Sequence, residues 1–235
     1  MIQISINGIP VEVEKKRIKN MYLRILPPEG RLHISAPLRM SEEEICRFVM
    51  AKQEWIKRQQ ARISVLHEHQ EPEYITGERI SVWGKPCQLE VVEALSHSRV
   101  EAAGDKVVLY VKQGSTREQR EKLLNQWYRK SLEAEVPRLL EQWERIIRVR
   151  TSGYSLRNME TRWGSCNVRT GKICLNLQLA GKPYDCLEYV VVHELVHLLE
   201  KSHNSVFKGY MDRFLPQWRN LKKILNSQLT SLTGF

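Results

Sequence analysis

The sequence lacks the features that mark a membrane or secreted protein. It contains no run of about 18 apolar residues, the length needed to span a bilayer. Its first eight residues show no charged segment followed by an apolar stretch and a small-residue cleavage site, so no signal peptide is expected. These absences predict a cytoplasmic protein without a membrane partner.

Cysteine is present, but its pattern does not fit a disulfide framework or a zinc ribbon. The number of cysteines is odd, because there are five. They are widely spaced, and no two of them form a C-x-x-C motif. We therefore expect reduced thiols, as in a reducing compartment. A second metal site formed by Cys166, Cys174 and Cys186 is an alternative, although these spacings match no zinc motif.

The sequence also lacks a basic tail of the kind that binds nucleic acid. Lys and Arg total 37 against 27 Asp and Glu, for a net charge of +10, yet no five consecutive residues are basic. Residues 151–235 carry 11 basic and 6 acidic side chains, which is half of the excess. This distribution favours an anionic partner such as a nucleotide, although a basic surface that serves only solubility is the commoner explanation of such a charge.

Hydrophobic spacing divides the chain into a β-rich part and a more helical part. Short alternating apolar and polar segments dominate residues 1–113, with a single helix from residue 41 to about residue 63. From residue 115, apolar residues recur at helical spacing, and Pro137 marks a kink or the start of another helix. No internal repeat of fixed period is evident. The sequence predicts an α+β protein with domains at residues 1–113 and 114–235.

The chemistry is carried by the segment His193-Glu194-Leu195-Val196-His197. Two histidines four residues apart on a helix lie on one face, so both imidazoles can bind one zinc ion. Glu194, next to the first histidine, is placed to act as the general base on a metal-activated water. Given the His and Glu content, a chance match to this H-E-x-x-H pattern is expected only about 0.02 times in such a chain.

The sequence also gives expectations for the ends of this helix and for a third metal ligand. Asp185 and Glu188 form a possible capping box at its start, and the helical pattern continues to Lys201. His203 follows that end and can return to the metal by a chain reversal, whereas Glu200 and Asp212 are the alternative ligands. The spacing of the three histidines equals that of metzincins, but Glu200 occupies the place of their turn glycine, so we do not assign the chain to them.

The segment before the metal helix alternates apolar and polar side chains. Its apolar members are Ile173, Leu175, Leu177 and Leu179. A strand of this kind can lie along a peptidase cleft and pair with an extended peptide, or it can be an ordinary strand of the sheet. Asn176 and Gln178 on the polar face are candidate substrate-binding residues. Arg162 is a third, because it can pair with a carboxylate or phosphate, although it can also brace the fold.

These segments together resemble the YgjP-like metallopeptidase family, which is distantly similar to SprT-type proteases. The resemblance rests on Arg162-Trp163-Gly164-Ser165-Cys166, Asn176 and residues 19–25, 189–198 and 203–207, and it extends over roughly residues 10 to 225. It implies a β-rich N-terminal part and a helical zincin-like core of minimal gluzincin type with a small edge-strand sheet. It also implies His193, His197 and His203 as ligands of one zinc ion, with Glu194 as the catalytic base.

The leading functional prediction is a zinc-dependent peptidase that acts on peptide or protein substrates. A metal-dependent nucleoside triphosphate phosphohydrolase or pyrophosphatase using the same site is an alternative, because the basic C-terminal region suits a polyanion. A DNA-associated, SprT-like protease is a further alternative, in which the N-terminal part binds nucleic acid.

Overall fold

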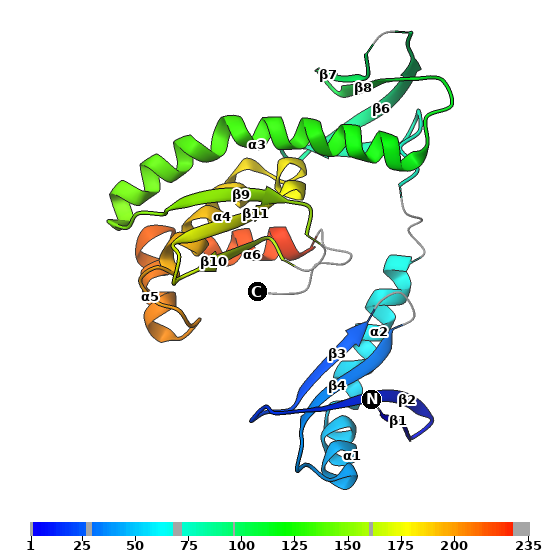
Figure 1. Ribbon diagram of the computed structural model, residues 1–235, viewed down its shortest axis with the longest axis vertical. Helices are drawn as coiled ribbons and strands as arrows, with labels where there is room; N and C mark the ends of the chain where they lie inside the picture. Colours follow the sequence, from blue (N-terminus) through cyan, green and yellow to red (C-terminus); the bar gives the residue numbers. More distant parts are fainter. Residues whose placement is uncertain (1, 27–29, 68–71, 96, 160–161, 228–235) are drawn as a thin grey trace. The chain divides into compact units, whose positions relative to one another are not determined.

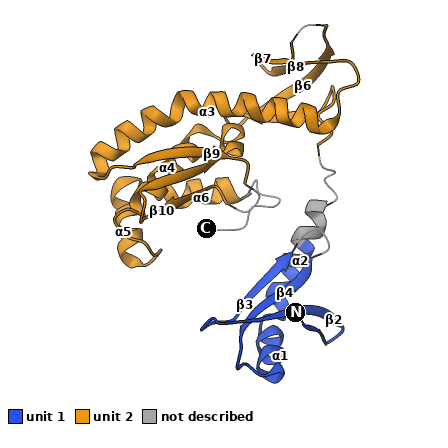
Figure 2. Cartoon of the chain, in the orientation of Figure 1, with its two compact units in different colours: residues 1–71 blue, residues 72–235 orange. Residues whose placement is uncertain are grey.

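The computed structural model describes residues 2–26, 30–67, 72–95, 97–159 and 162–227 (Figure 1). The chain forms two compact units, Met1–Glu71 and Pro72–Phe235 (Figure 2). The predicted boundary at 113/114 lies inside the second unit and stays a prediction about domains. Among the described residues, none of the helices combines the length and hydrophobicity that a bilayer span requires.

The first unit is a four-stranded sheet with two helices. Its strands are β1 (Ile2–Ile6), β2 (Ile9–Lys16), β3 (Tyr22–Leu26) and β4 (Arg31–Pro37), in the order β1-β2-β4-β3 with β2 and β4 parallel. The predicted single helix is two helices, α1 (Glu42–Ala51) and α2 (Gln53–His67), separated at Lys52. Alternation along the strands and the helix faces buries one core, which includes Val11, Val13, Ile34, Ile45 and Ile56.

The second unit begins with a sheet of the same topology. Its strands are β5 (Arg79–Val82), β6 (Lys85–Glu93), β7 (Arg99–Ala103) and β8 (Lys106–Val111), in the order β5-β6-β8-β7 with β6 and β8 parallel. Helix α3 (Arg117–Ile147) follows as one helix of 31 residues with Pro137 inside it, so Pro137 does not begin a new helix.

The shared topology is accompanied by shared residues. Residues 4–14 and 80–90 have Ile, Ser, Gly, Pro and Glu at matching positions. Both hairpin turns place two residues in the left-handed region, Asn7 and Gly8 with φ of 51° and 80°, and Trp83 and Gly84 with φ of 49° and 78°. We call β1–β4 with α1 and α2 the first module, and β5–β8 with α3 the second module. The structure therefore contains a repeat that hydrophobic spacing alone did not predict.

The remainder of the second unit is a three-stranded sheet followed by helices. Strands β9 (Gly153–Arg157), β10 (Gly164–Asn167) and β11 (Lys172–Asn176) lie in the order β10-β11-β9. A 3-10 helix η1 (Leu177–Gly181) and helices α4 (Tyr184–Val196), α5 (Ser205–Phe214) and α6 (Trp218–Ser227) follow. The protein is α+β, as predicted.

Two predictions about this region need correction. The predicted strand ends at Asn176, because the chain then enters η1, and β11 is the middle strand of its sheet. With neighbours on both sides, β11 cannot pair with a peptide, so it is an ordinary strand of the sheet. Helix α4 has Pro183 as its N-cap, and Asp185 and Glu188 do not form the predicted capping box.

The second module contacts the elements that precede and form the metal helix. The backbone N–H groups of Trp83 and Gly84 donate to the carbonyls of Ala180 and Gly181 in η1, at 2.8 and 3.3 Å. From α3, Trp143 Nε1 donates to Glu188 Oε1 of α4 at 3.0 Å. The Glu188 carboxylate thus accepts a hydrogen bond from another helix, whereas the sequence predicted that it would cap its own helix.

Candidate metal centre

Helix α4 is buried on nearly all sides, unlike a surface helix with a single apolar face. Val190, Val191 and Val192 are fully buried, and the following His193 and Glu194 are 2% and 1% exposed. The helix ends at Val196 with His197 as its C-cap. The prediction that it continues to Lys201 is wrong, because Leu198 and Leu199 bond to carbonyls three residues back in tighter turns.

The early end of α4 lets the chain bring a third histidine back to the first two. His193, His197 and His203 each offer a ligand atom, and these atoms lie within 4.8 Å of one another. The Nε2 atoms of His193 and His203 are 2.9 Å apart. Asn204 then caps α5 by accepting from the Phe207 N–H at 3.0 Å. The structure thus brings together the three histidines that the sequence singled out.

Neighbouring groups orient these rings. His197 Nδ1 lies 3.2 Å from the carbonyl oxygen of Glu200. An Nδ1–H donated to that carbonyl, the tautomer we assign from this contact, leaves Nε2 free to bind a metal. The Phe207 ring packs against all three imidazoles, with centroids 4.7 to 4.9 Å away. Sequence reasoning did not assign this role to Phe207; its position four residues after His203 was the available signal.

The alternative ligands lie elsewhere. Glu200 Oε1 accepts from the Ser202 N–H at 3.0 Å, and Asp212 pairs with Trp218 and Arg219. In the part of the chain that the structure describes, the three histidines are the only group of three or more His, Cys, Asp or Glu side chains close enough to share an ion. The cysteine site considered in the sequence is therefore not formed.

The electrostatics of the histidines suit a metal ligand. Burial, followed by the neighbouring histidines, lowers the pKa of His193 to about 2. Burial also lowers the pKa of His197 and of His203. Imidazoles must be neutral to bind a metal, and these are neutral at pH 7. Three converging neutral nitrogen donors fit a borderline divalent cation.

Glu194 is a buried carboxylate beside the first of these ligands. Its Oε2 atom has no hydrogen-bond partner among the described residues. Burial raises the pKa of Glu194 to about 8, and the positive charge of Arg162 opposes that rise. A buried carboxylate without a partner is costly, and a divalent cation nearby would compensate for it.

The predicted substrate residue Asn176 is fully buried and holds the chain. Its Nδ2 donates to the carbonyls of Met159 and Arg162, each at 2.7 Å, and its Oδ1 accepts from the Gln178 N–H at 3.1 Å. Arg162 itself is exposed. A substrate-binding role for Asn176 stays a prediction, and its contacts in the structure are with the chain.

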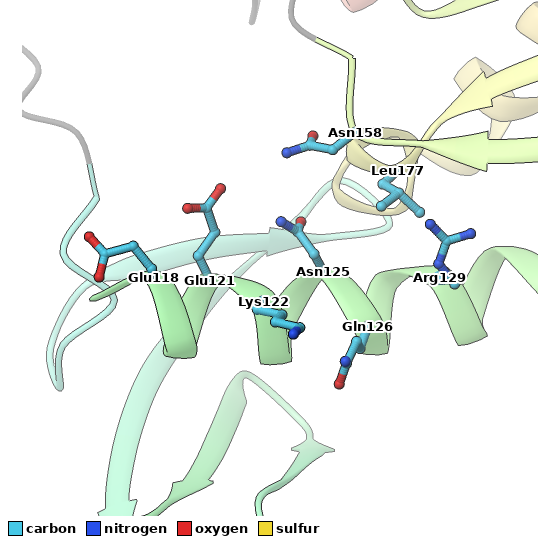
Figure 3. A pocket seen from close by; sticks show the side chains of 8 residues that line it. All are labelled: Glu118, Glu121, Lys122, Asn125, Gln126, Arg129, Asn158 and Leu177. Carbon is cyan, nitrogen blue, oxygen red and sulfur yellow. The ribbon is translucent and has the colours of Figure 1, made fainter. Parts of the chain in front are cut away.

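The side chain of Gln178 lies near a polar pocket away from the histidines. Gln178 Nε2 donates to Asn125 Oδ1 at 3.2 Å and to Asn158 Oδ1 at 3.1 Å. Both asparagines line an open pocket of about 340 Å³ along α3 (Figure 3). Its lining residues are Glu118, Glu121, Lys122, Asn125, Gln126, Arg129, Asn158 and Leu177, so none of the three histidines contributes to it. A substrate role for Gln178 also stays a prediction.

Two solved structures are similar to part of this chain. A search of curated proteins returned no match. Among solved structures, the metallopeptidase zymogen abylysin of Pyrococcus abyssi is 19% identical and covers 42% of this chain and 99% of its own, with a TM-score of 0.39. The metallopeptidase zymogen jannalysin of Methanocaldococcus jannaschii is 18% identical and covers 40% of this chain and 98% of its own, with a TM-score of 0.36.

The family comparison covers far more of the chain than the solved structures do. The family described as "YgjP-like, metallopeptidase domain" matches residues 19–228, which include all three histidines and Glu194. Its members are metal-dependent hydrolases, and the family implies a divalent metal. The chain belongs to the YgjP-like metallopeptidase family.

Proposed function

We propose that the protein is a zinc-dependent peptidase in which His193, His197 and His203 hold one zinc ion and Glu194 is the general base. The observation that carries the proposal is the convergence of three imidazoles, with ligand atoms within 4.8 Å of one another, beside a buried carboxylate. Family membership supports the reaction class, and the donor set supports the choice of metal.

The three histidines fit zinc because neutral nitrogen ligands leave its charge undiminished and a fourth position open. When bound, zinc would act as a Lewis acid that polarises the scissile carbonyl and lowers the pKa of water, so that water can lose a proton and attack the carbonyl carbon. His203 is the ligand that the chain reversal after α4 supplies, and Phe207 keeps the three rings in place through its contacts with them.

Glu194 is proposed to transfer the proton. Its carboxylate takes the proton from the attacking water, holds it while the tetrahedral carbon forms, and donates it to the leaving amine. Its position supports this role, since it follows the ligand His193 directly and is only 1% exposed. Burial keeps bulk water away, so the proton stays on the carboxyl group until the amine leaves.

The small sheet supports a peptide substrate. Among the strands that the structure describes, β10 lies at the edge of its sheet next to β11, and its first residue, Gly164, lies against Glu194. An extended peptide that adds to β10 through main-chain hydrogen bonds would therefore pass the proposed base. Arg162, exposed just before β10, is proposed to pair with a carboxylate of the substrate.

The test compares Glu194→Gln with the wild type on a peptide library. We expect the variant to keep one zinc ion per chain and to lose activity by about a thousandfold, within the range found for removing a general base. Glu200→Gln is the matched control, because Glu200 is a nearby carboxylate whose hydrogen bond to Ser202 an amide oxygen can replace. Full activity of Glu194→Gln would overturn the assignment of the base.

The same purified wild-type and Glu194→Gln proteins distinguish the peptidase proposal from its two alternatives. Nucleoside triphosphates are assayed as substrates beside the peptides, and binding to double-stranded DNA is measured at low and high salt, since family membership lends no support to either partner. Phosphate release without peptide cleavage, lost in Glu194→Gln, would replace the peptidase proposal with the phosphohydrolase one.

A further inference from the structure

We propose that Gly164 is a positioning residue for Glu194 and that Asn176 holds the segment that carries it. The inference rests on the proposed role of Glu194 for its catalytic meaning, but its geometric content stands separately. Gly164 is the first residue of β10 and pairs with Leu175 of β11, on the sheet that packs beside α4.

The room that Gly164 leaves is filled by the carboxylate. A Cβ atom built on Gly164 would lie 2.5 Å from Glu194 Oε1 and 2.9 Å from Glu194 Cγ. It would also lie 2.8 Å from Val190 Cγ1, one turn earlier on α4. All three distances are shorter than carbon contacts in proteins, which are about 3.5 Å or more. Any side chain at residue 164 must therefore displace both Glu194 and Val190.

Space, not backbone conformation, makes glycine necessary at this position. The φ angle of Gly164 is not positive, so a residue with a side chain could adopt its backbone conformation. Gly153 and Gly171, at other points around the same sheet, do have positive φ, of 140° and 67°. A substitution at residue 164 should thus affect function by displacing side chains of α4, and not by straining the backbone of β10.

Asn176 prevents β10 from moving away to make room. Its side-chain Nδ2 donates to the Arg162 carbonyl, and its backbone N–H donates to the Trp163 carbonyl at 2.9 Å. Trp163 is itself only 1% exposed. The two residues before Gly164 are therefore fixed by a fully buried asparagine, and on the other side α4 is fixed in the core. The side chains of Glu194 and Val190 are therefore the groups that must move, and of these two only Glu194 carries a carboxylate.

The first experiment measures the thermal unfolding of the metal-free protein in a double-mutant cycle. Gly164→Ala is expected to lower the midpoint, and to lower it less when Glu194→Ala has already removed the carboxylate. Gly209→Ala is the control, because a Cβ on Gly209 meets nothing within 4 Å, and its effect should add to that of Glu194→Ala. Additive effects of Gly164→Ala and Glu194→Ala would overturn the proposal.

The second experiment measures the zinc-loaded enzyme. Gly164→Ala should lower kcat by about a hundredfold, the cost of a misplacement of about 1 Å, while KM and the zinc dissociation constant change less than about threefold. Adding Val190→Ala to Gly164→Ala removes the overlap with Val190. The double variant should be more stable than Gly164→Ala alone, and its kcat should stay low. A zinc affinity lost in parallel with kcat, or kcat restored by Val190→Ala, would show that Gly164 acts through the helix and not through Glu194.

The two experiments also distinguish this inference from the proposed function. Coupling between residues 164 and 194 together with a fully active Glu194→Gln would retain the packing relation and overturn the catalytic role. Loss of activity in Glu194→Gln together with full activity in Gly164→Ala would retain the catalytic role and overturn the positioning role.

Discussion

The two modules have the same strand order and the same hairpin turn, yet their turns meet different surroundings. A Cβ on Gly8 would meet nothing within 4 Å, whereas one on Gly84 would lie 2.8 to 2.9 Å from Pro183. The turn of the second module also donates two backbone hydrogen bonds to η1, which leads into α4. One fold thus serves as a separate unit at one end of the chain and as a support for the metal helix in the second unit.

The helices of the two modules also differ in what they contact. In the first module the helical segment is divided at Lys52, and Ile56 of α2 completes the core of its own sheet. In the second module α3 continues unbroken for 31 residues and reaches α4 through Trp143. The comparison teaches that a longer helix lets the same strand arrangement contact α4, the helix that carries His193 and Glu194.

The largest expected effect comes from deleting strands. A chain of residues 72–235 should unfold in one cooperative transition and bind one zinc ion, because it retains the contacts among the second module, η1 and α4. A chain of residues 114–235 lacks β5–β8 and should lose both properties. Circular dichroism melting with metal analysis tests this. A cooperative, zinc-binding 114–235 chain would instead support the boundary at 113/114.

The next effect compares the two turn glycines, which share a left-handed backbone. Gly8→Ala should lower the free energy of unfolding of its unit by about 1 kcal/mol, the cost of that backbone region for an L-residue. Gly84→Ala should cost about 3 kcal/mol, because the added carbon also overlaps the backbone of Pro183. Urea denaturation of both variants measures the difference. Equal losses would show that the second turn does not pack closely against Pro183, the N-cap of α4.

The smallest effect compares two tryptophans of the module helices. Trp143→Phe removes the donor to Glu188 and should lower the free energy of unfolding by about 2 kcal/mol, as for a hydrogen bond to a charged group. Trp55→Phe should change it by less than about 0.5 kcal/mol, since Trp55 is 42% exposed. If both changes are small, α3 does not brace α4 through this contact.

The strands of both modules could be predicted because each has one face toward a core, which imposes alternation on its residues. The helix limits could not, because tertiary contacts override local capping signals. Glu188 illustrates this, since its carboxylate accepts from Trp143 instead of completing a cap with Asp185. The repeat was missed because the shared residues are few and confined to one window of eleven residues, and the strands that follow this window differ in length and spacing.

The grouping of the three histidines was predictable to the extent that it is local. Helical spacing places His193 and His197 on one face, and a short reversal is enough to add His203. The relation of Gly164 to Glu194 was not predictable, because it depends on the pairing of β10 with β11, and β10 is a strand of only four residues. Turn-like residues in so short a strand give no period-2 signal.

The end of α4 at Val196 has an electrical consequence. The last peptide groups of a helix leave partial negative charge at its carboxyl end, equivalent to about half an elementary charge. His197 is the C-cap of α4, so a cation held by the three imidazoles would lie at this negative pole. With the three neutral imidazoles as the proposed ligands, the helix itself would still attract a cation, and no carboxylate ligand would reduce the charge that the ion presents to a substrate.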